Sequence, residues 1–227
     1  MKYEFEMIKL VVVLKKEKNL DVENFQSQLL KYDLSFERAL PNLKGYSQSH
    51  TLKSGYSKIT PVADGIAEFE FDNIDDCREC MNSKEFEKVR RDFNQFTKAK
   101  ENIYLLVEER VIKDKKISVD GVKSIELVKK KEGMKVQDFQ KYWTETHGPL
   151  GGSIPQVNRY VQNHVTQESY GLEEPPKLDG LAITWFDSTQ DMRRAASTEE
   201  YRLTRADEEN FLTIPLDFII TKEHLFF

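Results

Sequence analysis

The chain carries one sequence pattern twice, and this repeat restricts its fold more than any other feature. Residues 8–50 align without a gap with residues 122–164 at an offset of 114, and residues 64–111 align with residues 179–226 at an offset of 115. Identical pairs recur along both segments, among them Phe25/Phe139, Gln26/Gln140, Pro41/Pro155, Tyr46/Tyr160, Gln48/Gln162, His50/His164, Asp64/Asp179, Gly65/Gly180, Arg90/Arg205 and Asp92/Asp207. A repeat of this length predicts two structural units of the same kind.

The two copies nearly fill the 227 residues, so no third domain is expected. We expect a first repeat at residues 1–113, a linker at 114–120 and a second repeat at 121–227. The net charge of −5 and the isoelectric point near 5.6 argue against a nucleic-acid-binding surface. The longest apolar run, Met7–Leu14, is too short to span a membrane and lacks the features of a signal peptide. These features predict a cytoplasmic protein that binds neither nucleic acid nor membrane.

Cys77 and Cys80 form a C-x-x-C motif, which can mark a redox pair or half of a metal site. The second copy has Met192 and Ala195 at these positions. Small apolar side chains three residues apart are typical of one buried helix face, and no second C-x-x-C motif completes a metal site. We therefore expect both cysteines in the hydrophobic core and no metal.

Each copy predicts the same order of elements: strand, helix, strand, strand, helix, strand. The expected strands are 7–14, 43–51, 66–71 and 103–112 in the first copy and 122–128, 157–165, 181–186 and 218–226 in the second. The first helix of the second copy is expected to begin near Val136, and bent helical stretches are expected over 74–98 and 189–211. Asp72 and Asp187 precede these stretches, and we expect them to act as N-caps.

This order is that of the ferredoxin-like βαββαβ unit, an antiparallel sheet with both helices on one face. The other face of each sheet must be buried, and the second copy is the obvious partner. The predicted fold is therefore α+β, with two ferredoxin-like repeats packed sheet to sheet as an α+β barrel within one chain. The lumen of such a barrel is expected to form a small-ligand cavity.

The strand after each conserved proline carries polar residues at alternate positions, Tyr46, Gln48 and His50 in the first copy and Tyr160, Gln162 and His164 in the second. Alternate side chains share one face of a strand. We assign this polar face to the lumen and the small or apolar face to the helices. An equally weighted alternative is that these side chains only satisfy one another's hydrogen bonds.

One stretch of the second copy has no counterpart in the first: Tyr142 and Trp143 are followed by His147, Gly148 and Pro149. Residues four apart lie on one helical face, and the Gly-Pro pair is expected to end the helix just after the histidine. The partial negative charge of a helix end would favour the protonated imidazole and suit it to acid–base chemistry. The alternative is a plain C-terminal cap, but such a cap should have been equally useful in the first copy.

The second copy resembles an EthD domain of the dimeric α+β barrel superfamily. The resemblance lies in the segment from Phe139 through the His-Gly-Pro-Leu sequence, followed in order by Ile154-Pro155, 159–165, Trp185-Phe186-Asp187 and Ala206-Asp207-Glu208. The first copy resembles a diverged EthD domain without the histidine. The resemblance implies a tandem version of a barrel that relatives assemble from two chains. It also implies an enzyme or binding protein for small organic molecules, since similar barrels include cofactor-free monooxygenases, cyclases, dehydratases, decarboxylases and isomerases.

Carried over to this sequence, the resemblance implies His147 and His164 as catalytic groups, with Tyr142, Trp143, Tyr160 and Gln162 contacting the substrate. The polar strand face of the first copy adds His50 to the expected substrate contacts. The leading hypothesis is acid–base chemistry, of oxidoreductase or lyase/isomerase type, on a small phenolic or carbonyl compound without a cofactor. The alternatives are a non-catalytic small-molecule binder or stress protein and, less favoured, a haem protein. The pattern Arg-x-Asp occurs in both copies, as Arg205 and Asp207 in the second, which favours a structural salt bridge or cap between elements. Pairing of two chains into a homodimer is left open.

Overall fold

The computed structural model describes residues 7–32, 39–57 and 59–227. The chain divides into two compact units, the first formed by Met7–Val107 with Thr221–Phe227 and the second by Glu108–Ile220. Strands β4 (Ile103–Asp114) and β8 (Asp217–Leu225) each contribute residues to both units. The linker at 114–120 was inferred from the bounds of the sequence repeat, and it stays a prediction.

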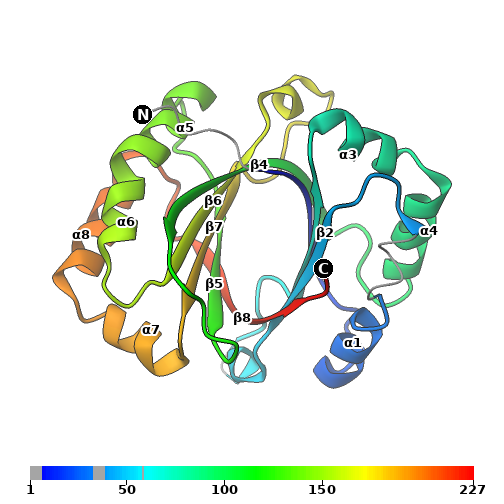
Figure 1. Ribbon diagram of the computed structural model, residues 1–227, viewed down its shortest axis with the longest axis horizontal. Helices are drawn as coiled ribbons and strands as arrows, with labels where there is room; N and C mark the ends of the chain where they lie inside the picture. The colour runs from blue at the N-terminus through cyan, green and yellow to red at the C-terminus, as the bar shows by residue number, and fades with distance from the viewer. Residues whose placement is uncertain (1–6, 33–38, 58) are drawn as a thin grey trace. The chain divides into compact units, whose positions relative to one another are not determined.

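The first unit contains the strand, helix, strand, strand, helix, strand order that the sequence predicts, with the second helix divided in two. Its elements are β1 (Met7–Leu14), α1 (Val22–Leu29), β2 (Gly45–Thr51), the 3₁₀ turn η1 (Lys53–Tyr56), β3 (Gly65–Phe71), α3 (Ile74–Met81), α4 (Lys84–Phe93) and β4. β3 pairs antiparallel with both β1 and β2, and β2 also pairs with β8. The helices of this unit lie together on one side of its strands (Figure 1).

The second unit repeats this order. Its elements are β5 (Val122–Val128), α5 (Val136–Tyr142), the π turn η2 (Trp143–His147), α6 (Gly148–Ser153), β6 (Arg159–Val165), the 3₁₀ turn η3 (Gln167–Gly171), β7 (Gly180–Phe186), α7 (Thr189–Ala195), α8 (Glu199–Asp207), the 3₁₀ turn η4 (Glu208–Asn210) and β8. β7 pairs antiparallel with β5 and β6, as β3 does with β1 and β2. The helices again lie together on one side of the strands (Figure 1).

The eight strands are hydrogen-bonded in the order β1-β3-β2-β8-β5-β7-β6-β4 and form a closed barrel. The α+β class and the barrel that the sequence predicts are therefore confirmed. Residues that correspond in the sequence repeat also have corresponding strand partners: Leu10 pairs with Phe69, and Ser124 pairs with Thr184.

The N-caps of the two second helices lie one residue beyond the aspartates that we expected. Asn73 accepts a hydrogen bond from the backbone of Asp76 at the start of α3, and Ser188 does the same at the start of α7. Asp72 instead forms an ion pair with Lys44 at 2.8 Å. The expected caps were wrong because the helices begin at Ile74 and Thr189, and the residue directly before each helix has the extended geometry that a cap requires.

The first unit has an aromatic core between its sheet and its helices, built around Phe25, Phe69, Phe86 and Phe93. Cys77 and Cys80 belong to this core, are fully buried and are not joined by a disulfide. Burial raises the pKa of each thiol to about 12, so both stay protonated. Their expected role as core residues is confirmed.

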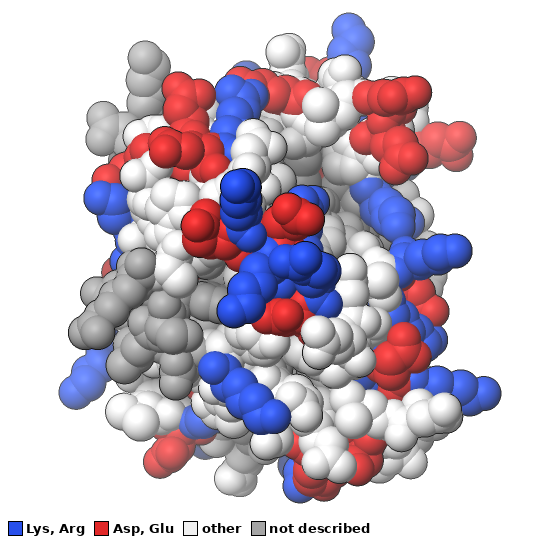
Figure 2. All heavy atoms as spheres, turned by 90° about the vertical axis from the view of Figure 1, so that its right-hand side faces the viewer, with Lys and Arg blue, Asp and Glu red and all other residues white. Residues whose placement is uncertain are grey.

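The outer surface of α1, α3 and α4 is charged with both signs interspersed (Figure 2). Ion pairs such as Lys53 with Glu23 account for part of this mixture. Exposed pairs of this kind contribute little to stability, typically below about 1 kcal/mol each. None of the helices within the described ranges is both long and apolar enough to cross a membrane.

Candidate active site

The polar residues that alternate along β2 and β6 face the helices of their own unit, not the opposite face of the sheet. The Gln48 Nε2 atom donates to the carbonyls of Leu29 and Tyr32 at 2.9 and 2.7 Å, just where α1 ends. In the second unit the Gln162 Nε2 atom donates to the carbonyl of Trp143 at 2.8 Å. The assignment of this face to the lumen was therefore wrong. Gln48 supplies donors for carbonyls at the end of α1, and Gln162 adds a second donor to a carbonyl that the π turn already uses.

His164 lies in this structural network. Its Nε2 atom is 3.0 Å from Gln162 Oε1, and its ring packs against Trp143 with the centroids 4.3 Å apart. Tyr160 completes the group, because its hydroxyl accepts hydrogen bonds from Trp143 at 3.2 Å and from Gln162 at 3.0 Å. Burial, with Arg110 adding to it, holds the pKa of His164 well below its usual value. His164 is therefore a neutral, enclosed imidazole.

His50 has the corresponding place in the first unit, with its Nε2 atom 2.8 Å from Gln48 Oε1. Burial, together with His224 whose ring centroid lies 4.5 Å away, lowers the pKa of His50 to about 3. The structure thus brings His50 and His164 into two equivalent hydrogen-bond networks. It does not bring them together with His147.

A cavity of about 240 Å³ lies within the second unit, between the strands and helices α6, α7 and α8. Of the residues that the sequence singled out for the site, His147 and Tyr160 line it. The other polar or charged lining side chains are Ser124, Glu126, Thr184, Arg193, Tyr201, Thr204, Arg205 and Glu208. Apolar groups such as Val157 and Phe186 complete the wall. Tyr142, Trp143, Gln162, His164 and His50 are not part of this lining.

The cavity is lined at positions that belong to the apolar core in the first unit. At the offsets of the repeat, Ser124, Glu126, Thr184, Thr204 and Glu208 correspond to Leu10, Val12, Phe69, Val89 and Phe93. All five counterparts are buried members of the aromatic core of the first unit. Smaller or charged side chains therefore stand where the same fold otherwise packs large apolar ones. This replacement is what opens the space.

His147 reaches the cavity from the middle of a continuous helical segment. The N–H of Gly148 bonds to the carbonyl of Trp143 five residues back, which makes a π turn, and α6 follows at once. Pro149 stands in the first turn of α6, where a missing N–H is tolerated. The expectation that the helix ends after His147 was wrong, and with it the argument from the helix end. π turns of this kind are common at functional sites.

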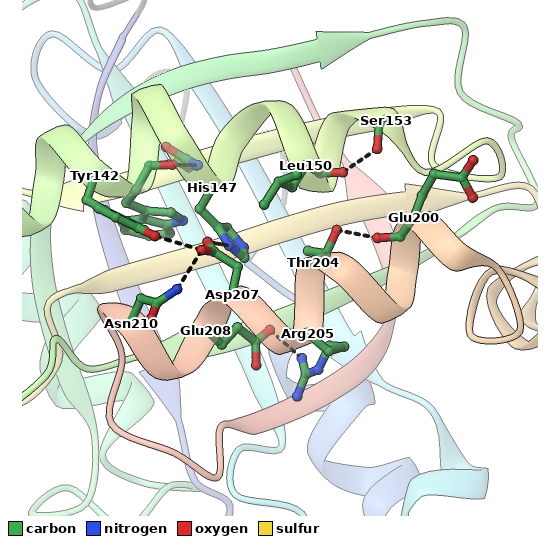
Figure 3. A network of polar contacts seen from close by, with 12 residues as sticks. Tyr142, His147, Leu150, Ser153, Glu200, Thr204, Arg205, Asp207, Glu208 and Asn210 are labelled. Carbon is green, nitrogen blue, oxygen red and sulfur yellow. Dashed lines mark hydrogen bonds and ion pairs between the residues drawn. The ribbon is translucent and has the colours of Figure 1, made fainter.

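Asp207 at the end of α8 orients the imidazole (Figure 3). Its Oδ2 atom is 3.0 Å from His147 Nδ1, while its Oδ1 atom accepts from the hydroxyl of Tyr142 at 2.7 Å and from Asn210 at 3.0 Å. Burial would raise the pKa of Asp207, but these hydrogen bonds outweigh it and the pKa is lowered. Asp207 is therefore ionised and accepts the Nδ1–H of the histidine. The ring of Phe211, centred 4.8 Å from that of His147, packs beside it.

His147 is accordingly neutral near pH 7, with its Nε2 lone pair available. Burial lowers its pKa and the hydrogen bond and charge of Asp207 only partly restore it. A carboxylate on Nδ1 fixes the proton there and leaves Nε2 as the basic atom, the arrangement used by histidine general bases. Tyr142 holds Asp207 by its hydrogen bond, and its predicted contact with a substrate stays a prediction.

Three further charged residues form a second group on the cavity wall. One nitrogen of Arg205, Nη1, lies 2.9 Å from Glu126 Oε1 and 2.8 Å from Glu208 Oε1. Arg205 and Glu208 are drawn in Figure 3. Sequence reasoning missed both glutamates and gave Arg205 and Asp207 only a structural role, as a salt bridge or cap between elements. The available signal was that the first copy has Val12 and Phe93 where the second has acids. In the ranges that the structure describes, no three His, Cys, Asp or Glu side chains are placed to hold a metal ion.

Solved structures of the same fold align with nearly the whole chain. An anthrone oxidase-like protein aligns over 99% of this chain and 94% of its own, with 10% identity and a TM-score of 0.67. A protein from Lactobacillus acidophilus NCFM, provisionally assigned as a monooxygenase, aligns over 96% and 95%, with 13% identity and a TM-score of 0.58. At these identities the likeness shows the fold, which is that of α+β barrel proteins.

Part of the second unit also matches a protein-family model. Residues 131–214 match the model of the EthD domain. The matched segment includes His147, Asp207, Arg205 and Glu208. No curated protein matches the chain.

Proposed function

We propose that the second unit is a small-molecule enzyme in which His147 acts as a general base within the cavity. The observation that carries this proposal is that buried apolar core residues of one unit are replaced, in the other, by the polar and ionisable lining of a cavity. A change confined to stability would not place a neutral imidazole, held by an ionised carboxylate, at the edge of an internal space.

The substrate is a compact neutral compound, such as a phenol, a quinone or a β-keto compound. The cavity volume of about 240 Å³ lies below the ~300–1,000 Å³ range of sites for drug-sized ligands. Its wall combines apolar side chains with the hydroxyls of Ser124, Thr184 and Tyr201. The wall carries two acids, Glu126 and Glu208, and two cations, Arg193 and Arg205, so its charges do not favour a substrate of either sign. His147 Nε2 would remove a proton from a C–H or O–H group of the bound compound.

The test is a panel of these compounds with the wild type, His147→Gln and Asp207→Asn. We expect turnover to fall by roughly 10²- to 10⁴-fold in both variants, because the first removes the base and the second its fixed tautomer. Asp92→Asn is the matched control, because Asp92 is the first-unit counterpart of Asp207. Equal turnover in wild type and His147→Gln would refute the proposal.

A non-catalytic binder would use the same cavity, and the same panel separates the two functions. Ligand binding by calorimetry without turnover of any compound would favour the binder. An absorption spectrum of the purified protein tests the haem alternative, in which a histidine would serve as axial ligand. Tandem duplication as the origin of the two units, a cytoplasmic location and a homodimer remain predictions, the last of which sedimentation of the intact chain tests.

A further inference from the structure

Two carboxylates meet at a single guanidinium in the wall of the cavity. Glu126 on β5 and Glu208 at the start of η4 each place an oxygen within 3 Å of the same Arg205 nitrogen. Glu208 keeps only 5% of its side-chain surface exposed, and Glu126 keeps 27% because it borders the cavity. One cation cannot neutralise two buried anions. The fully ionised group would therefore carry an uncompensated negative charge away from bulk water.

A single shared proton removes this excess charge. Burial, together with repulsion from Glu126 and Asp207, raises the pKa of Glu208 to about 8 despite the attraction of Arg205. Burial also raises the pKa of Glu126. Tyr160 on β6, Tyr201 on α8 and His147 on the cavity edge also face the pair, and all three are neutral near pH 7. The remaining charged side chain of the cavity lining is Arg193 on α7, which is exposed and, among the residues that the structure describes, forms no ion pair with either glutamate. The two glutamates thus hold one proton between them, as closely spaced carboxylates do.

The arginine is present in both units, whereas the two acids are present only in the second. The Arg205 guanidinium lies 6.0 Å from the ring of Tyr201, and its counterpart Arg90 lies 6.0 Å from the ring of Phe86. In the first unit the positions of the glutamates are occupied by core residues. A second unit built only for stability would not place two acids beside this arginine, since replacing such a group by apolar residues is often neutral or stabilising.

We propose that the Glu126–Glu208 pair, oriented by Arg205, is the acid of the site and donates its proton to the oxygen of a neutral carbonyl substrate. This rests on the proposed role of His147 as base. His147 Nε2 takes a proton from the carbon beside the carbonyl, the electrons of that C–H bond form a C=C bond, and the C=O π electrons bind the proton from the carboxyl pair. The product is the enol of the same compound, so the step needs no oxidant.

Resetting the site returns both protons. The imidazolium of His147 gives its proton to solvent or to another carbon of the enol, and the carboxyl pair takes one back. The reaction class is therefore proton transfer next to a carbonyl, that is, enolisation and isomerisation. Acid–base catalysis of this kind uses two titratable groups whose different surroundings give them different pKa values, so that one is a base and the other an acid.

The shared proton can be measured without a substrate. We expect the infrared spectrum of the wild type at neutral pH to show a protonated carboxyl band that is lost in Glu208→Gln and in Glu126→Gln, because either change lets the remaining glutamate ionise beside Arg205. Glu199→Gln, which alters an exposed glutamate paired with Arg202, is the matched control and keeps the band. A wild-type spectrum in which both glutamates are ionised overturns the proposal.

The catalytic role is measured by exchange of the hydrogen beside the carbonyl of a β-keto compound in heavy water, followed by NMR. We expect Glu208→Gln to slow exchange at least ~100-fold and to shift the alkaline limb of the pH–rate profile. Unchanged exchange in Glu208→Gln refutes the acid role even when His147→Gln is inactive. Unchanged exchange in His147→Gln refutes the proposed base, whatever the infrared spectrum shows, so the two failures are distinguishable.

Discussion

Substituting Glu208 by glutamine should change how the stability of the protein depends on pH. The pKa of Glu208 in the folded protein is about 8, against a reference value of 4.5. A raised pKa means that the folded state binds the proton more tightly than the unfolded state. The contribution of this group to stability is therefore full below the unfolded pKa and is lost as the pH rises through the folded pKa.

The size of this loss follows from the two pKa values. Between about pH 5 and about pH 9 the difference in proton binding amounts to about 4 kcal/mol, taking ~1.4 kcal/mol per pKa unit. Because only 5% of the Glu208 side chain is exposed, solvent screening removes little of it. Glu208→Gln has no proton to lose, so the free energy of unfolding of the variant should lack this decline.

Urea unfolding at a series of pH values measures the effect. We expect the curves of wild type and Glu208→Gln to separate as the pH rises, with the variant gaining relative stability by about 4 kcal/mol across the range. Glu199→Gln, at an exposed position, should follow the wild type. Parallel curves for wild type and Glu208→Gln would show that the glutamate ionises normally, and the reasoning about the buried pair would fail.

Two further predictions concern the frame around the site. Gly180→Ala should destabilise the protein by about 1–3 kcal/mol, because the added carbon would collide with the carbonyl oxygen of Asn163 and the ring of Trp143. At Gly65, by contrast, the nearest atoms, including the carbonyl oxygen of Ser49, are 3.2 Å or more away, so equal thermal midpoints for Gly180→Ala and Gly65→Ala would contradict this. Gln162→Ala should cost about 1–3 kcal/mol, because it leaves the buried carbonyl of Trp143 without its side-chain donor; denaturant unfolding within ~0.5 kcal/mol of wild type would show that the network is dispensable.

The elements of the fold could be predicted from the sequence because each appears twice. The strand expected at 122–128 is found with those bounds, and the helix expected near Val136 begins there. A pattern read twice averages out local accidents of composition. The face of β6 could not be predicted in this way. Residues of both faces, such as Val161 and Gln162, are fully buried, so polarity does not reveal which side meets the helices.

The site could be predicted only in part. His147 was found because the two copies differ there, and it does line the cavity. Its partner Asp207 is 60 residues away in sequence and present in both copies, so comparison of the copies concealed it. Glu126 and Glu208 were visible as differences between the copies, but an acid among strand or helix residues resembles an ordinary surface position until the neighbouring elements are placed.

The two fillings of one backbone have a consequence for protein engineering. Five positions of the repeat hold either Leu, Val, Phe, Val and Phe, which make a core, or Ser, Glu, Thr, Thr and Glu, which make a cavity. These positions form a transferable set, because the strand registers around them are the same in both halves. Moving the polar set into the first half is a direct route to a second, designed pocket. Such a pocket also costs stability, because truncating a buried phenylalanine typically destabilises a protein by about 3–5 kcal/mol.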